Sequence, residues 1–256
     1  MPGIYYGPYG AHNSTFAEPT GGNTGPYPAG HSLILPDGRV YRMCMNDGTA
    51  EVAGNLYTAS ALTANHKGVV VDTARAVGAT VISATLGATL AAIDTYAEGY
   101  VHPNLTPGIG YNYRIQRAYA AGDAHAAAAA SAVLTVNLAP GDTVQVALTT
   151  STEVTFNYNR FKGTGVIIHG SPPVAALAGV SPGVAAANRW YWTQVQGMAG
   201  VLVQGTLVIG DFCVPSATVD GAVMPSAAFE TDGPYVGIVD DIRADGEYGL
   251  VDLKIM

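Results

Sequence analysis

The clearest shortage in this 256-residue sequence is charge. Only 12% of the residues are Asp, Glu, Lys or Arg, about half of the ~25% that is usual in soluble domains. The 11 basic residues are scattered, and the densest group is the pair Arg114 and Arg117. Because neutralising phosphates requires grouped Lys and Arg side chains, we expect no direct binding of nucleic acid. The net charge of −8 supports the same expectation.

Cysteine and long apolar runs are also scarce. Cys44 and Cys213 are the only two cysteines, and their spacing is not that of a metal site. They allow one disulfide, but two buried thiols are expected in a chain made in a reducing cytosol. No apolar run reaches the ~18 residues of a membrane span. The first ten residues lack the basic start and apolar core of a signal peptide, so we expect no association with a membrane.

Motifs with a chemical mechanism are few, and each departs from its pattern. Residues 179–183 match G-x-S-x-G, the nucleophile elbow of many hydrolases, but Pro182 follows Ser181. Proline has no N–H to donate to an oxyanion hole, so we expect no catalysis at this serine. The segment 163–165 lacks the third glycine of a dinucleotide-binding loop, and no Walker sequence is present.

Metal-binding patterns are equally incomplete. The acidic segment 240–247 has Arg243 where a calcium loop needs an oxygen ligand. The histidines form no metal-binding pair and are expected in loops or on the surface: His12, His31, His66, His102, His125 and His169. We therefore predict no catalytic residue, no bound metal and no cofactor.

Residues 189–211 are the richest in aromatic and β-branched side chains. Both tryptophans, Trp190 and Trp192, lie here, and the alternation of side chains along a strand places them on one face. Since tryptophan has a large apolar area, we predict that both anchor a core. Gly197 and Gly200 are expected to bracket a turn, which would give a tight β-meander.

Short strand-like segments separated by turns continue through the chain. Asp37-Gly38 lies between two apolar runs and predicts a hairpin with a type I′ turn. Further strands are expected at 49–63, 69–71, 80–89, 97–101, 111–115, 133–136, 143–158 (two strands), 165–169, 236–240 and 250–255. The alanine-rich run 124–130 is expected to form a loop or one helical turn. This pattern predicts an all-β fold, mainly antiparallel, with a β-sandwich or barrel body.

Composition suggests three regions. Residues 1–30 are rich in Gly, Pro and Tyr and almost free of aliphatic side chains, so they are expected to form an extended N-terminal arm. This arm either becomes ordered against a neighbour or remains a flexible terminus. Its aromatic residues are candidate contacts with a capsid or another subunit: Tyr5, Tyr6, Tyr9, Phe16 and Tyr27. Residues 31–170 are expected to form a β-rich domain, and residues 171–256 a second β subdomain or barrel that is separate from the first or continuous with it.

Eight short segments, distributed over most of the chain, carry a resemblance to one family. They are LPDGRVYR (35–42), AGNLYT (53–58), VGATVISATLGAT (77–89), YAEGYV (96–101), YNYRI (111–115), VALTTSTEV (146–154), YWTQVQG (191–197) and YGLVDLKI (248–255). They resemble structural proteins of tailed-bacteriophage virions, which include capsid cement and decoration proteins. The family's aromatic-Trp-Val-Gln-Thr-Trp-Gly box is altered, since Thr193 and Val195 hold the valine and threonine places and Gln196 replaces the second tryptophan.

The resemblance implies a non-enzymatic, β-rich shell component that is assembled in the bacterial cytoplasm and resides on the virion. It implies binding to the outer surface of the major capsid protein lattice, with no catalytic residues to carry over. The low charge and the 15 tyrosines suit broad protein contacts, and the acidic net charge suits the outside of a shell better than its DNA-lined inside. Capsid axes favour closed cyclic oligomers, so a homotrimer is expected.

Two alternatives from other classes remain open. A tail or head-fibre module would bind glycans of the host surface through exposed aromatic side chains, for which Tyr5, Tyr6 and Trp192 are the candidates. A virion hydrolase would need carboxylates that converge, or a histidine beside a nucleophile, and the sequence pairs no such residues.

Overall fold

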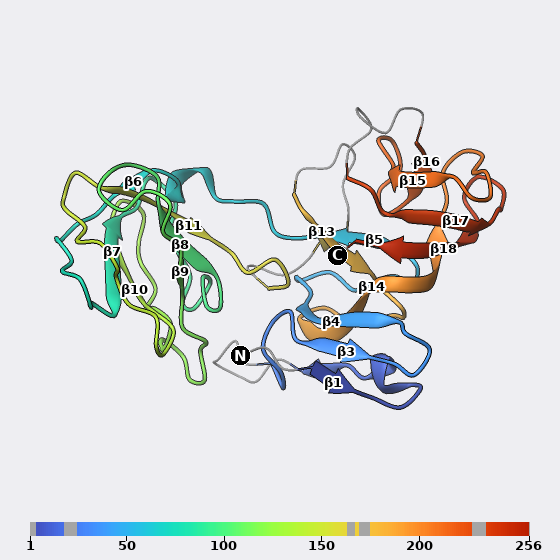
Figure 1. The fold of residues 1–256 in the computed structure, drawn as a ribbon, viewed down its shortest axis with the longest axis horizontal. Coiled ribbons are helices and arrows are strands. Elements are labelled where there is room, and N and C mark those ends of the chain that lie inside the picture. Colours follow the sequence, from blue (N-terminus) through green and yellow to red (C-terminus); the bar gives the residue numbers. More distant parts are fainter. Residues whose placement is uncertain (1–3, 18–24, 163–166, 169–174, 227–233, 256) are drawn as a thin grey trace. The chain divides into compact units, whose positions relative to one another are not determined.

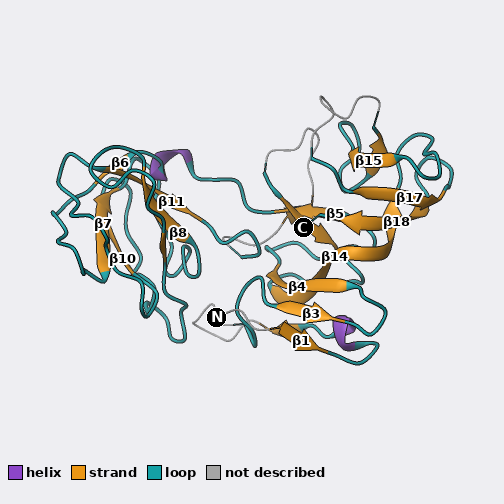
Figure 2. Cartoon of the chain, viewed as in Figure 1, coloured by secondary structure: helices purple, strands orange, loops and turns teal. Residues whose placement is uncertain are grey.

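The computed structural model describes residues 4–17, 25–162, 167–168, 175–226 and 234–255. Strands and isolated bridges account for 39% of the described residues, which contain no α-helix, only two short 3₁₀ turns (Figure 2). The fold is therefore all-β and mainly antiparallel, as predicted. Contacts between residues divide the chain into two compact units. Unit 1 comprises residues 1–17, 29–60 and 160–256, and unit 2 comprises residues 18–28 and 61–159.

Unit 1 is built on one large sheet. Its strands are β1 (Ile4–Tyr6), β2 (Phe16–Ala17), β3 (Ser32–Ile34), β4 (Val40–Met45), β5 (Leu56–Thr58), β12 (Ile167–Ile168), β13 (Leu177–Val180), β14 (Arg189–Leu202), β15 (Phe212–Pro215), β16 (Val223–Pro225), β17 (Gly237–Asp241) and β18 (Tyr248–Lys254). The main path through the sheet runs β1-β3-β4-β14-β18-β17-β15-β16, and Figure 1 shows the first four of these strands side by side. All described pairs are antiparallel except β1 with β3.

The longest strand, β14, connects the two halves of this sheet. Its first half pairs with β4, with Tyr191 opposite Cys44, and its second half pairs with β18, with Gly200 opposite Leu250. The side chains of residues 190–195 are all buried, so the strand is covered on both faces at this point. Trp190 and Trp192 lie in this covered stretch, with exposed fractions of 0% and 2%.

The predicted turn between Gly197 and Gly200 is wrong, because β14 continues through both residues to Leu202. The pairing register with β4 shifts between Gln194 and Gln196, which marks a β-bulge. Gly197 follows this bulge with φ +84°, a conformation that glycine adopts readily and that bends the strand without ending it. Spacing between glycines alone could not distinguish such a bulge from a turn.

The predicted hairpin at Asp37-Gly38 is present between β3 and β4, where Ile34 pairs with Val40. Its turn differs from the predicted type I′ form, since Gly38 has positive φ and Asp37 does not. The Gly38 N–H donates to Leu35 O (3.0 Å), which closes a longer loop that begins with Pro36.

Unit 2 contains two smaller sheets and one 3₁₀ turn, η2 (Ala64–His66). Its strands are β6 (Val69–Val70), β7 (Val81–Thr85), β8 (Tyr100–Pro103), β9 (Tyr113–Arg114), β10 (Val133–Asn137) and β11 (Glu153–Asn157). β7 pairs with β10, and the other strands follow the order β6-β11-β8-β9. A strand was predicted at residues 143–148, but the structure has none there. These residues contribute one isolated bridge, from Leu148 to Arg75.

The alanine-rich run 124–130 forms a loop, and a buried carboxylate holds its start in place. Asp94 Oδ1 accepts the N–H groups of Ala124 (3.0 Å) and His125 (3.1 Å), and its Oδ2 accepts the Gly122 N–H (2.6 Å). Because the Asp94 carboxylate accepts these three N–H groups, the start of the loop can be buried without leaving them unpaired.

Two histidines are buried in unit 2 where surface exposure was expected: His125 lies in the loop 124–130, as a loop position allowed, and His66 lies in the 3₁₀ turn η2. His66 and His125 are each 1% exposed, and the rings of both contact the buried ring of Tyr96. His125 Nε2 accepts the Tyr96 N–H (3.0 Å) while its Nδ1 contacts Ala126 O (2.8 Å), so the ring is neutral with its proton on Nδ1. Both histidines have structural hydrogen bonds, which scattered positions in the sequence could not indicate.

The described part of the N-terminal region belongs to the chain's own sheet. β1 pairs with β3, and Phe16 of β2 pairs with Trp190. Residues 29–60 also belong with residues 160–256, because β4 and β5 pair with β14 and β13. The compact units therefore differ from the expected regions 1–30, 31–170 and 171–256. The reason is that strands far apart in sequence pair with each other.

Replacing Trp190 with Ala is expected to destabilise unit 1 by about 3–5 kcal/mol, because it removes a fully buried indole and leaves a cavity. The remaining tryptophan, Trp192, also lies in unit 1, so urea unfolding followed by its fluorescence measures this unit. Tyr6→Ala is the control. Tyr6 is 73% exposed, and its loss is expected to change stability by less than about 0.5 kcal/mol. Equal effects of the two variants would contradict the anchoring role of Trp190.

Candidate functional site in the groove along β14

Three hollows that share lining residues lie along β14 in unit 1. Their volumes are about 580, 220 and 530 Å³. The first and third share Arg39 and Met198, and the first and second share His12, Pro182 and Val184. We call this continuous depression the β14 groove.

The N-terminal segment forms one wall of the groove. His12 belongs to the short turn η1 (Ala11–Asn13), and Asn13 and Thr15 line the second hollow beside it. The imidazole of His12 stacks on the ring of Tyr41, with ring centroids 4.9 Å apart and planes 18° apart. Burial lowers the pKa of His12, and the nearby Arg39 guanidinium lowers it further, so the neutral imidazole is favoured.

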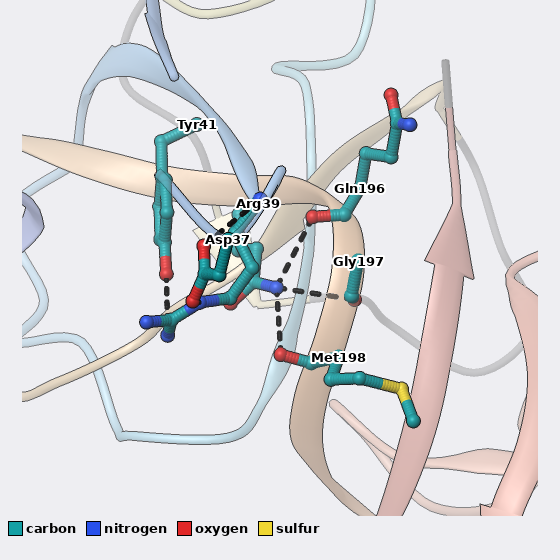
Figure 3. A network of polar contacts seen from close by, with 7 residues as sticks. Asp37, Arg39, Tyr41, Gln196, Gly197 and Met198 are labelled. Carbon is teal, nitrogen blue, oxygen red and sulfur yellow. Dashed lines mark hydrogen bonds and ion pairs between the residues drawn. The ribbon is translucent and has the colours of Figure 1, made fainter. Parts of the chain in front are cut away.

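Arg39 lies where two of the hollows meet, and it is held by two partners (Figure 3). Its Nε donates to Asp37 Oδ2 (2.7 Å) and its Nη1 donates to Tyr41 Oη (3.0 Å). Burial alone would raise the pKa of the Asp37 carboxyl, but the hydrogen bonds from Arg39 outweigh it and lower that pKa. Burial raises the pKa of Tyr41 to about 12, so its hydroxyl stays protonated. The guanidinium is therefore fixed in the wall of the groove.

Gln194 stabilises the bend in β14 that forms the floor of the groove. Its Nε2 donates to the carbonyl oxygens of Gln196 (3.2 Å), Gly197 (3.1 Å) and Met198 (2.9 Å); Figure 3 labels these three acceptor residues and draws the contacts as dashed lines. The amide thus connects three successive carbonyl groups at the bend, where the pairing of β14 with β4 ends. Gly197 also lies directly against Arg39, since a Cβ there would come within 3.0 Å of Arg39 Cγ. A side chain at position 197 would therefore displace Arg39, so the absence of a side chain at the bend allows Arg39 its position.

The G-x-S-x-G segment forms part of the rim of the groove. Ser181 is buried, and its hydroxyl donates to the carbonyl oxygen of Gly183 (2.7 Å). The segment begins in the last two residues of β13, and no helix comes after it in the described part of the chain. The serine therefore closes a turn, and Pro182 contributes an apolar surface to two of the hollows.

The aromatic residues predicted to make contacts are not all brought together. Tyr5, Tyr6 and Tyr9 lie within one N-terminal segment of unit 1 and are exposed, with fractions of 40%, 73% and 64%. Phe16 is partly buried beside β14, and Tyr27 is partly buried and belongs to unit 2. Trp192 is buried, yet it lines the second hollow of the groove.

Sequence reasoning missed the residues that build the groove itself. His12, Arg39, Gln194 and Met198 come from segments far apart in the chain, so no local motif connects them. The one local signal is Gln194, an amide inside an otherwise apolar run, because a buried amide needs several hydrogen-bond partners.

Metal chemistry and thiol chemistry have no candidates among the residues described. No group of three or more His, Cys, Asp or Glu side chains in this part of the chain could hold a metal ion. Cys44 and Cys213 are both free and buried, and burial raises the pKa of both thiols, that of Cys213 to about 12. Within the same residues, no helix has the length and apolar character needed to span a membrane.

Glu51, which precedes the lining residue Val52 in the sequence, is a buried acid. Glu51 is 2% exposed, and its backbone N–H donates to Ala185 O (2.7 Å). Burial raises the pKa of its carboxyl to about 8, although the hydroxyls of Tyr57 and Tyr191 partly offset this. The folded chain therefore holds Glu51 as a neutral acid at pH values where an exposed carboxyl is ionised.

Comparison with known proteins identifies no relative: no family model, curated protein or solved structure matches this chain.

The raised pKa of Glu51 predicts a pH-dependent stability. Below about pH 4.5, the ordinary value, the carboxyl is protonated in both the folded and the unfolded chain. Between about pH 4.5 and 8 the unfolded chain releases this proton and the folded chain keeps it, so stability falls as the pH rises. Glu51→Gln, which mimics the neutral acid, is expected to raise the melting temperature at pH 8 and to leave it nearly unchanged at pH 4.5.

Thermal unfolding at several pH values checks this expectation. The matched control is Asp240→Asn, which changes an exposed carboxylate and is expected to move the melting curve little at either pH. A Glu51→Gln variant that loses stability with pH as steeply as the parent would contradict the buried-acid assignment.

Proposed function

We propose that this chain is a non-enzymatic structural protein of a tailed-bacteriophage virion. In this proposal it binds the outer surface of the major capsid protein lattice as a decoration protein and stabilises the head. The family resemblance of the eight short segments supports the proposal, and so do the low charge and the all-β body. A low density of charge suits surfaces that become covered by protein, since charged residues are depleted at the centre of interfaces.

The observation that carries the proposal is the β14 groove. It is open and runs past successive hollows, as a site for an extended polypeptide segment would. Its lining combines apolar side chains such as Val52, Pro182 and Met198 with hydrogen-bonding groups from Arg39 and His12. An arm or loop of a lattice protein would find apolar contacts for its side chains and polar partners for its backbone there.

The state of the polar side chains supports a role in binding. Arg39 is fixed by Asp37 and Tyr41, and the Ser181 hydroxyl donates to a backbone carbonyl, so both are engaged within the fold. Fixed donors and acceptors favour recognition because little side-chain freedom is lost when a partner binds.

The exposed tyrosines extend the proposed contact surface. Tyr9 is close enough to Arg39 to affect the electrostatic environment of the guanidinium, so the N-terminal segment continues from the wall of the groove. Tyrosine offers a large contact area with a hydrogen-bonding tip, which suits protein interfaces. We further propose that three copies associate around a symmetry axis of the shell, because closed cyclic assemblies match such axes.

Blocking the groove tests the proposal. Gly200 lines the first hollow, has an ordinary φ, and has no atom within 4 Å of an added Cβ, so Gly200→Phe can fill the groove without strain. Shells of the virus that encodes the chain, purified without it, are mixed with the variant and sedimented. Binding is expected to fall at least about tenfold, which corresponds to ~1.4 kcal/mol of lost contact.

The matched control is Gly48→Phe. Gly48 is exposed, has equally open surroundings and does not line the groove, so this variant adds the same side chain elsewhere on unit 1. It is expected to bind shells as the parent does. If the parent binds no shells, the proposed function is wrong. If Gly200→Phe binds as well as the parent, the groove is not the contact.

A further inference from the structure

Unit 2 has a shallow hollow of about 400 Å³ on one face of its four-stranded sheet. Strand β8 and the loop before β9 contribute its aromatic side chains, Tyr100 and Tyr111, which are 37% and 42% exposed. The polar lining comes from His102, Asn112 and Asn157. This hollow is formed entirely within unit 2, so it is separate from the β14 groove.

The strand register places the polar groups together. Tyr100 and His102 alternate with the buried Val101, so both project from the exposed face of β8. Asn157 of β11 is paired with Tyr100, and its Nδ2 donates to His102 Nδ1 (2.8 Å). The neutral imidazole then carries its proton on Nε2, which has no hydrogen-bond partner among the described residues.

The ring of Tyr111 packs against the ring of Tyr113. Its ring is nearly parallel to that of Tyr113, with planes 7° apart and centroids separated by 6.4 Å. Tyr113 is buried and its hydroxyl accepts the Gln145 N–H (3.2 Å), so it is a fixed platform. The exposed aromatic surface of Tyr111 is therefore part of an ordered structure.

We propose that this hollow binds a neutral saccharide. The faces of aromatic rings attract the polarised C–H groups of a sugar ring, and the surrounding hydroxyl, amide and imidazole groups can each pair with sugar hydroxyls. The hydroxyls of Tyr100 and Tyr111 and the amide of Asn112 have no hydrogen-bond partner among the described residues, so they are available to a ligand.

The absence of charged side chains from the lining favours an uncharged ligand. Lys, Arg, Asp and Glu are absent from the described residues that line the hollow. Arg114 is opposite Tyr100 in the strand ladder but does not line the hollow. Among the lining residues an anionic ligand would find no Lys or Arg, whereas an uncharged polyhydroxylated ligand would find donors and acceptors. This inference does not depend on binding to a capsid lattice.

The test uses the full-length chain and an array of neutral oligosaccharides built from glucose, galactose, mannose and N-acetylglucosamine, with uronic-acid oligosaccharides beside them. The parent is expected to bind at least one neutral oligosaccharide. Titration calorimetry with that oligosaccharide then compares variants. Tyr111→Ala is expected to weaken binding at least about tenfold, since the stacking surface is lost. Tyr111→Phe, which keeps the ring, is expected to retain most of the affinity.

Tyr119→Ala is the matched control, because Tyr119 is a 73% exposed tyrosine of the same unit outside the hollow. It is expected to bind as the parent does. Asn112→Ala gives a second, independent loss if Tyr111→Ala fails to fold. The proposal is overturned if no neutral oligosaccharide binds, or if Tyr119→Ala weakens binding as much as Tyr111→Ala. It is also overturned if only uronic-acid oligosaccharides bind and Arg114→Gln abolishes that binding.

Discussion

The backbone pairing of β14 is the interaction on which unit 1 depends. This one strand hydrogen-bonds to β4 along its first half and to β18 along its second half, so it joins the N-terminal and C-terminal parts of the sheet. The change of partner coincides with the bulge that follows Gln194. Because bulges increase the local twist and bend a strand, the two halves of β14 can follow different neighbours without interrupting the sheet.

The same bend creates the groove. A flat, fully paired strand would present a regular row of side chains, whereas the bulge at Gln194 and Gly197 opens space that Arg39 and Met198 border. The fixed contacts of Arg39 then give this space a defined polar edge. The proposed recognition site is thus a consequence of how the sheet changes partners, and its shape is maintained by the backbone.

Local patterns predicted much of the fold because the information was contained in short segments. The hairpin around Gly38 and the strands near residues 81–85, 133–137 and 248–254 follow from alternation and turn residues alone. The continuity of β14 could not be predicted, since a glycine with positive φ serves equally in a turn and in a bulge. Only the pairing partner decides between them, and here the partner is distant in sequence.

The candidate site was less predictable than the fold, for a related reason. The β14 groove is assembled from His12, Arg39, Pro182 and Met198, and no spacing in the sequence connects them. The buried state of Glu51 and of the core histidines was also hidden. Their burial depends on tertiary hydrogen bonds and on packing. From the sequence alone, a titratable residue is expected to be exposed.

Because β14 pairs with β4, a strand made much earlier, part of unit 1 can form only late in synthesis. Tyr191 is made about 150 residues after its partner Cys44. At a synthesis rate of about 5–20 residues per second, β4 waits roughly 8–30 seconds for the strand that completes it. Residues 61–159, most of unit 2, leave the ribosome within that interval. Most of unit 2 can therefore fold before unit 1 is complete. During that time the edge of β4 that later pairs with β14 is unpaired, and we expect a chaperone to bind there.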